Sequence, residues 1–378
     1  MRSFTASTTL VTGGAGFIGS AVVRELLRRT EGFVIVLDAL TYAGGRDNLP
    51  DDPRVVLLEG DVADARAVQE TFEVDRPARV LHLAAESHVD RSIDGPLAFV
   101  RTNLEGTAVM LEAARRHWAT LEGAERDAFR FVHVSTDEVF GSLGDEGAFT
   151  PDTPYDPRSP YSASKAGSDH LARAWWHTFG LPVVVTNCSN NYGPRQHPEK
   201  LIPHMILRAL AGEPLPVYGS GANVRDWLHV EDHARGLVEA ALGGASGATY
   251  LFGGGAERTN LEVVRALCRL LDERRPAGAP HERLVAFVAD RPGHDHRYAI
   301  DAASARDGLG WAPQRGFEDG LAATVDWYLA HAEWCARRVG GEGLARRGTA
   351  AAPAGTTGST TGAAGGATGA APDTEAPR

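Results

Sequence analysis

The stretch VTGGAGFIGS, Val11–Ser20, decides the fold of this chain of 378 residues. The short apolar run TTLVT leads into it, and SAVVRELLRR, with the periodicity of a helix, follows. Glycines at 13, 16 and 19 allow a tight turn, a close approach of backbone amides to a pyrophosphate, and close packing of helix on strand. The spacing alone is a weak signal, but its place between a strand and a helix predicts a dinucleotide-binding turn.

Further apolar runs alternate with helical patterns through the first half of the chain, namely FVIVLD, RVVLLEGDV, RVLHLAA and FRFVHVST. This alternation predicts βαβ units and an α/β fold with a Rossmann-type, doubly wound parallel sheet. We expect a NAD-binding domain over residues 1–186, rejoined by a segment near 226–255, and a smaller α/β substrate lobe over 187–338. Residues 339–378, rich in Ala, Gly, Thr and Pro, have the composition of a disordered tail.

Composition excludes several classes of function. The net charge of −11 and the lack of a Lys/Arg-rich run argue against nucleic acid and anionic membranes as partners. The N-terminus lacks the apolar core of a signal peptide, and no apolar run has membrane-spanning length. The three cysteines are scattered and the histidines lack ligand spacing, so we expect no metal site and a reduced cytoplasmic location.

The second predicted strand ends in Asp38, 19 residues after Gly19. A carboxylate at this place can accept hydrogen bonds from ribose hydroxyls and repels a 2′-phosphate, so it favours NAD over NADP. The alternative is an ordinary strand-end Asp that caps a turn.

A candidate catalytic pair stands in YSASK, where Tyr161 and Lys165 are four residues apart at the start of a predicted helix and so share one face. Tyrosine titrates near pH 10, but a nearby ammonium and an oxidised nicotinamide both favour the phenolate. Lys165 and Lys200 are the only lysines in an Arg-rich chain. The YxxxK pattern is common by chance. It indicates a catalytic pair here because it follows a predicted nucleotide-binding turn in the same chain.

Two adjacent acids, Asp137 and Glu138, follow the run FRFVHV. Ligands of open α/β sheets bind at the carboxyl ends of the strands, so both lie on the edge where chemistry is expected. In isolation the ordinary explanation is a solvated turn, because charged side chains are mostly exposed.

The chain resembles the extended short-chain dehydrogenase/reductase family and, within it, the dTDP-glucose 4,6-dehydratases. The resemblance covers about residues 7 to 335 and rests on HLAAESHVDRSI, VSTDEVFG, YSASKAGSDHL, NCSNNYGP, PEKLIP, VRDWLHVEDHARGL and RPGHDHRYAID, in this order. It implies oxidation of a nucleotide sugar at C4, elimination of water across C5 and C6, and return of the hydride to C6. It assigns Glu138 as the base at C5, Asp137 as the acid at C6, and Thr136 as a hydrogen-bond partner of the C4 oxygen beside Tyr161.

The resemblance also implies a set of contacts position by position, and a homodimer by analogy. The NAD-binding positions are Gly13, Gly16, Phe17, Ile18, Gly19, Asp38, Leu40, Thr41, Asp61, Val62, Ala84, Ala85, Ser87, Thr102, Tyr161, Lys165 and Asn191. The positions around the nucleotide sugar are Ser87, Thr136, Asp137, Glu138, Asn190, Lys200, Leu201, Pro203, Pro216, Tyr218, Arg225, Asn260, Arg291 and His294. Taken singly, Arg225 and Asp226 could be a surface ion pair, and Asn260 could be a helix N-cap.

Some features depart from the family pattern. Phe140 stands where a Tyr is usual, and Arg195–Gln196 replaces a more aromatic stretch, which bears on recognition of the base. A dehydratase of a CDP- or GDP-linked sugar and a non-catalytic NAD(H)-binding regulator are the alternatives. Sister epimerases and decarboxylases share the cofactor site but lack the adjacent Asp-Glu.

Overall fold

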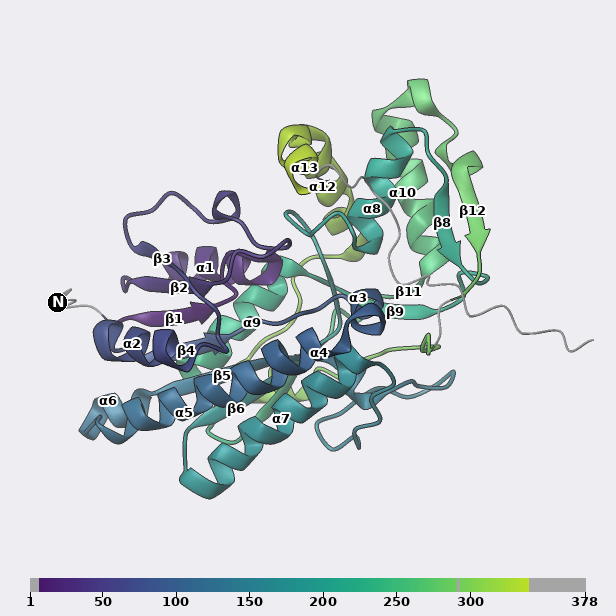
Figure 1. Ribbon diagram of the computed structural model, residues 1–378. Coiled ribbons are helices and arrows are strands. Elements are labelled where there is room, and N and C mark those ends of the chain that lie inside the picture. The colour runs from purple at the N-terminus through teal and green to yellow at the C-terminus, as the bar shows by residue number, and fades with distance from the viewer. Residues whose placement is uncertain (1–6, 291–292, 340–378) are drawn as a thin grey trace, which may run out of the picture.

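The protein, seen in a computed structural model that describes residues 7–290 and 293–339, is built on a seven-stranded parallel sheet (Figure 1). The strand order is β10-β6-β5-β4-β1-β2-β3. Successive strands are added outward from β1 on one side and outward from β4 on the other, so the order reverses between β1 and β4. The strands are β1 (Thr9–Thr12), β2 (Val34–Asp38), β3 (Val55–Glu59), β4 (Arg79–His82), β5 (Arg130–Thr136), β6 (Val183–Cys188) and β10 (Thr249–Phe252). The predicted doubly wound sheet is confirmed, and such sheets bind ligands where the strand order reverses.

Helices cover both faces of this sheet. One face carries α1 (Phe17–Arg29), α9 (Val230–Gly243) and α11 (Ala303–Leu309), and the other carries α2 (Ala65–Asp75), α5 (Gly106–Ala119) and α7 (Pro160–Phe179) (Figure 1). Because both faces are covered, every residue of β1, β2 and β6 is buried. This explains why these strands are near-continuous apolar runs.

A second group of elements lies beyond one end of the sheet (Figure 1). It holds a three-stranded sheet of order β11-β9-β7 and a parallel pair of β12 and β8. Its strands are β7 (Asn190–Tyr192), β8 (Leu215–Tyr218), β9 (Val224–His229), β11 (Glu257–Thr259) and β12 (Val285–Val288), and its helices are α8 (Leu201–Leu210), α10 (Asn260–Arg274), α12 (Phe317–Ala330) and α13 (Ala332–Val339). A core of its own joins these helices and strands.

Short helical segments complete the described chain: α3 (Val89–Asp94), α4 (Pro96–Phe99), the π-helical turn η2 (Val100–Glu105), α6 (Gly123–Ala128), and the 3₁₀ turns η1 (Arg46–Asn48), η3 (Asp137–Phe140), η4 (Pro276–Gly278) and η5 (His281–Leu284). No helix within 7–290 and 293–339 is long and apolar enough to cross a membrane.

Two of the sequence predictions, Arg291 and the tail beyond residue 339, lie outside the described residues.

Candidate active site

The glycine turn between β1 and α1 has the geometry that its sequence requires. Gly13 has a φ of +67°, and a Cβ there would lie 2.8 Å from the backbone of Ala84. A Cβ on Gly19 would lie 2.1 Å from the carbonyl oxygen of Gly13. A side chain at either position would therefore disrupt the turn. Because both residues are glycines, the backbone leaves room for a ligand at the start of α1. This is the cradle that a dinucleotide pyrophosphate needs.

Asp38 is held beside this turn by two backbone amides. Its Oδ2 accepts a hydrogen bond of 2.9 Å from the amide of Ala15, and its Oδ1 accepts one of 2.8 Å from Leu40. Burial raises the pKa of the carboxyl, and these two bonds oppose the rise. Each oxygen keeps a second lone pair, so the carboxylate can also accept bonds from a ribose. The glycine cradle and this acceptor together fit NAD.

The cofactor turn opens into a cavity of about 360 Å³ that continues along the carboxyl edge of the sheet. Most sequence-predicted residues line it: Gly13, Gly16, Phe17, Ile18, Gly19, Asp38, Thr41, Asp61, Val62, Ala84, Ala85, Ser87, Thr102, Thr136, Asp137, Glu138, Tyr161, Lys165, Asn190, Asn191 and Lys200. The cavity therefore joins the predicted cofactor positions to the predicted catalytic ones. Among the predicted residues that the structure describes, those that do not line it are Leu40, Leu201, Pro203, Pro216, Tyr218, Arg225, Asn260 and His294.

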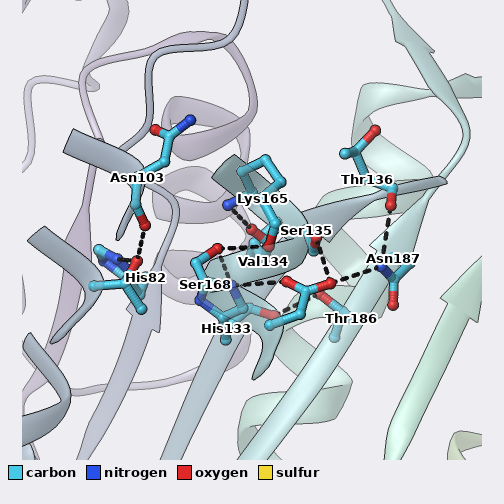
Figure 2. Close-up of polar contacts among 12 residues, drawn as sticks. His82, Asn103, His133, Val134, Ser135, Thr136, Lys165, Ser168, Thr186 and Asn187 are labelled. Atoms are coloured by element: carbon cyan, nitrogen blue, oxygen red, sulfur yellow. Dashed lines mark hydrogen bonds and ion pairs between the residues drawn. The ribbon is translucent and has the colours of Figure 1, made fainter. Parts of the chain in front are cut away.

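Tyr161 and Lys165 lie in the first turns of α7, and both are buried. The helix begins at Pro160, and the preceding Ser159 forms a capping box with Ser162. The ammonium of Lys165 donates a hydrogen bond of 2.8 Å to the carbonyl of Val134 on β5 (Figure 2). The cap and this bond fix where the pair lies relative to the sheet edge.

The surroundings that the chain itself gives Tyr161 oppose ionisation of its phenol. Burial is the main cause that raises the pKa of this phenol well above its usual value, and the charge of Glu138 adds to it. A hydrogen bond from Thr136 acts in the opposite direction. The groups of the chain therefore favour the neutral phenol, and a positive charge placed beside it is needed to lower its pKa.

The two adjacent acids differ in their surroundings. Asp137 is only 2% exposed and Glu138 is partly exposed, so the solvated-turn explanation is wrong for Asp137. Burial raises the pKa of Asp137 well above its usual value, and the charges of Glu138 and Asp226 add to this. Thr136 Oγ1 donates to Asp137 Oδ1 at 3.3 Å and accepts from the amide of Glu138 at 3.3 Å. The site thus holds one carboxyl that favours its protonated form.

Arg225 does not form the surface pair that its sequence allowed. The guanidinium is 5% exposed and donates to the carbonyls of Val224 at 2.7 Å and Asp295 at 3.0 Å. It also lies 4.2 Å from the ring centroid of Tyr298. Asp226 instead accepts from the backbone amides of Gly254 and Ala256, in the loop between β10 and β11. The surface-pair alternative is wrong because β9 buries both residues within the second lobe.

The other predicted sugar-nucleotide positions fall into two groups. Lys200 Nζ donates to the carbonyl of Ser87 at 2.8 Å at the cavity wall. Farther out, the hydroxyl of Tyr218 donates to Asp90 at 3.0 Å, and its ring lies 5.8 Å from that of His294. Thr259, not Asn260, is the N-cap of α10, because its hydroxyl accepts from the amide of Glu262, so the N-cap alternative for Asn260 is wrong.

Some cavity residues were not among the predicted site positions: Leu37, Ala39, Ala43, Gly44, Gly60, Leu83, Glu86, Val134, Ser135, Cys188, Ser189, Gln196, His197 and Glu199. Several, such as Leu37 and Cys188, lie at the carboxyl ends of strands of the sheet, and that position was a usable signal. Glu199 had no such signal in the sequence, because its place in the cavity wall depends on an ion pair of 2.9 Å with Arg91.

The departure at Phe140 is accommodated by packing. Its ring stacks on Phe149 with centroids 5.1 Å apart and meets Tyr155 edge-on, also at 5.1 Å. A buried aromatic cluster thus replaces the missing hydroxyl and supports the turn that carries the two acids.

A doubly wound sheet, a glycine-rich turn and a YxxxK pair beside a second lobe define the extended short-chain dehydrogenase/reductases. The model of the family described as GDP-mannose 4,6 dehydratase matches residues 10–324. Curated dTDP-glucose 4,6-dehydratases of Xanthomonas campestris and Neisseria gonorrhoeae are 56% and 57% identical to the chain, over 87% and 85% of it and 95% of each relative. The chain therefore belongs to the dTDP-glucose 4,6-dehydratase family.

Solved structures agree with this assignment. The dTDP-glucose 4,6-dehydratase of Streptomyces venezuelae with NAD and dTDP bound has a TM-score of 0.80 at 47% identity, covering 88% of this chain and 99% of that chain. A UDP-glucose 4-epimerase of Thermus thermophilus in complex with NAD has a TM-score of 0.76 at 32% identity, covering 86% and 99%. The fold is thus shared with epimerases, and the distinction rests on the site and on sequence identity.

Proposed function

We propose that the protein is an NAD-dependent hydro-lyase that converts dTDP-glucose to dTDP-4-keto-6-deoxyglucose. The observation that carries this proposal is the pair of adjacent carboxyls at the end of β5, one buried with a raised pKa and one partly exposed. An elimination needs an acid and a base at the same time, and this pair supplies both within one turn. Relatives with this activity, at 52–57% identity, support it.

The cofactor would be held by the glycine turn at its pyrophosphate and by Asp38 at its adenosine ribose. When bound, NAD would supply the hydride acceptor for C4 of the sugar and, once reduced, the hydride donor for C6. Its positive nicotinamide ring would supply the charge that the Tyr161 phenol needs for ionisation. Because the carboxylate of Asp38 would repel a 2′-phosphate, we propose NAD rather than NADP.

The chain's own residues account for each proton movement. Tyr161 would take the proton of the C4 hydroxyl, and Thr136 would donate a hydrogen bond to the C4 oxygen. With a ketone at C4 the C5 hydrogen becomes acidic, so the carboxylate of Glu138 suffices to remove it. Asp137 would give its proton to the C6 hydroxyl, which departs as water, and a C5=C6 double bond forms.

A dehydratase of another nucleotide sugar is the second candidate, because the matching family model is described as GDP-mannose 4,6 dehydratase. The departure at Arg195–Gln196 bears on this choice. Gln196 donates to the carbonyl of Asn191 at 2.8 Å and lines the cavity, and Arg195 lies over the ring of Trp327 at 5.4 Å. The identities of the curated relatives favour the dTDP-linked sugar.

The test is incubation of the purified protein with dTDP-glucose, CDP-glucose and GDP-mannose in parallel. A 4-keto-6-deoxy sugar absorbs near-ultraviolet light in mild alkali, and we expect this product from dTDP-glucose alone. Product mainly from GDP-mannose or CDP-glucose would assign the second candidate. No product from any of them, with NAD retained, would assign a non-catalytic NAD(H)-binding regulator.

We also propose a homodimer. The helices α5 and α7 run side by side along one face of the molecule (Figure 1). Exposed apolar side chains occur in α4, in η2 and at the last residue of α7: Leu97 is 79% exposed, Val100 46% and Phe179 45%. Exposed apolar groups along these helices support an interaction surface. Light scattering of wild type and Leu97→Glu would test it, with a fall from dimer to monomer mass expected.

The division into domains and the cellular location are further proposals. We propose a division into a NAD-binding domain (1–186, with the return near 226–255) and a sugar-nucleotide lobe (187–338), which the separate core of the second lobe supports. We propose a cytoplasmic location, which the three free cysteines fit.

A further inference from the structure

Asp169 lies on the same face of α7 as the predicted catalytic pair, four residues beyond Lys165 and eight beyond Tyr161. Its side chain is 0% exposed. It does not line the cavity, and the mechanism above does not use it. A fully buried carboxylate this close to an active site requires a reason, because burial of a charge is costly unless it is paired and hydrogen-bonded.

The surroundings of Asp169 keep it ionised. Its Oδ2 accepts hydrogen bonds of 2.8 Å from the hydroxyls of Ser135 and Tyr155, and one of 3.3 Å from the amide of Asn187. Its Oδ1 lies 3.0 Å from Nε2 of His133. These partners and nearby positive charge lower the pKa of the carboxyl despite its burial.

The partners of Asp169 come from the segments that carry the site. Ser135 directly precedes Thr136 on β5, and Asn187 on β6 also donates to the carbonyl of Thr136 at 3.0 Å (Figure 2). Lys165 holds the carbonyl of Val134, on the same strand. One carboxylate thus fastens the end of β5 to β6 and to the catalytic helix.

Asp169 also supplies the counter-charge for the buried ammonium of Lys165. Burial lowers the pKa of Lys165, and the charge of Asp169 is the main effect that opposes this. Burial is the main cause that lowers the pKa of His133, and the charge of Lys165 adds to this, whereas Asp169 opposes it. Asp169, which lies 3.0 Å from Nε2 of His133, is thus a buried negative charge that His133 and the ammonium share.

We infer that Asp169 is a positioning residue of the reaction, which places a buried negative charge one helical turn from Lys165 and fixes the strand end that presents Thr136 to the C4 oxygen. This inference rests on the proposed function. It gives the buried polar cluster at the carboxyl edge of the sheet a role in turnover besides its role in folding.

The first test measures Lys165 directly and needs no turnover. The chain has only two lysines, so lysine labelled with ¹³C at Cε gives two NMR signals, and Lys200→Arg assigns them. We expect Asp169→Asn to lower the pKa of Lys165, because the counter-charge is lost. Tyr155→Phe removes one hydrogen bond but keeps the charge, and should leave that pKa unchanged. An unchanged pKa in Asp169→Asn would overturn the inference.

The second test follows turnover of dTDP-glucose. Asp169→Asn should lower kcat by up to about 10²-fold with KM little changed, since a small misplacement of catalytic groups costs that much. The alkaline limb of its pH profile should move to lower pH, because Lys165 loses its proton earlier. Asp232→Asn is the matched control, since Asp232 is also buried and bonded, to Arg235 at 2.6 Å, yet lies outside the site. It should lower stability without moving the pH profile.

The outcomes separate the two proposals. If wild type makes no product from dTDP-glucose but Asp169→Asn lowers the pKa of Lys165, the proposed function fails and the pairing of Asp169 with Lys165 stands. If wild type is active and Asp169→Asn matches its kcat and pH profile, only the inference fails. Should Asp169→Asn not fold, the double variant Ser135→Ala/Tyr155→Phe decides: a lower kcat at unchanged KM is expected, and an unchanged kcat overturns the inference.

Discussion

The indole of Trp334 donates a hydrogen bond of 3.0 Å to Oδ1 of Asn48, 286 residues earlier in the chain. Asn48 in turn donates to the carbonyl of Ala15 in the glycine turn at 2.8 Å. Nearby, Arg338 donates to the carbonyl of Gly44 at 2.8 Å. The last described helix, α13, is thus fastened to the loop that lines the adenosine end of the cavity.

This fastening predicts a long-range effect on the cofactor. Trp334→Phe keeps an aromatic ring in the second core but removes the N–H, so the loop at Asn48 loses one of its anchors. We expect the Kd for NAD to rise by about 3- to 10-fold, in line with about 1 kcal/mol for one buried hydrogen bond. Fluorescence titration of protein stripped of NAD measures it. Trp327→Phe, on the same lobe, is the control, and an equal rise there would refute the specific role of Trp334.

A second prediction concerns cofactor choice. Asp38→Ala removes the acceptor for the ribose and the charge that repels a 2′-phosphate, so NAD binding should weaken by about 10-fold while NADP binding improves. Calorimetric titration with both dinucleotides checks this. Asp61→Ala tests whether any carboxylate at this edge has the same effect, and we expect it to change the NAD/NADP ratio less. A ratio unaltered by Asp38→Ala would contradict the assigned role.

The raised pKa of Asp137 predicts a pH-dependent cost in stability. Between about pH 4, where the carboxyl of an unfolded chain titrates, and its higher folded pKa, the native state holds a proton that the unfolded state lacks. Stability from this group is therefore complete at low pH and is lost as pH rises. Asp137→Asn cannot ionise, so it should unfold at a higher temperature than wild type at pH 8, and the difference should be smaller at pH 5. Thermal melts at both pH values test this; a difference equal at both would exclude ionisation as the cause.

The sequence predicted the sheet and the cofactor turn because both depend on local signals. The alternation of apolar runs with helical patterns and the strand–turn–helix context of Gly13, Gly16 and Gly19 suffice to place them. The edge location of Asp137 and Glu138 follows from the same pattern. That part of the site is set by the order of elements along the chain.

The unequal burial of Asp137 and Glu138, and the role of Asp169, could not be predicted from local signals. Asp137 is buried where the second lobe meets the sheet, and Asp226 and Arg225, which influence its pKa, come from a strand almost ninety residues later. The sequence shows Asp169 four residues after Lys165, but the hydrogen-bond partners of Asp169 lie on β5, on β6 and in the loop at Tyr155. Local spacing shows which face of a helix a residue shares, and tertiary contacts decide what it meets there.

The last prediction separates the two acids. Glu138→Gln removes the base at C5 but leaves Tyr161 and Lys165 in place, so oxidation at C4 should still occur. Absorbance of the reduced cofactor should then appear in a single turnover, without 4-keto-6-deoxy product. Asp137→Asn instead removes the acid that assists departure of the C6 hydroxyl, and loss of a general acid typically costs about 10²–10⁴-fold in rate.

A substrate with a better leaving group distinguishes these defects. The analogue of dTDP-glucose with fluoride at C6 needs little help from an acid, so it should restore much of the rate of Asp137→Asn. It should not rescue Glu138→Gln, because the C5 proton still has no base to accept it. Rapid-quench analysis of both variants with both substrates gives four rates. Equal rescue of the two variants, or rescue of neither, would show that the roles of Asp137 and Glu138 are not divided as the burial of one and the exposure of the other suggest.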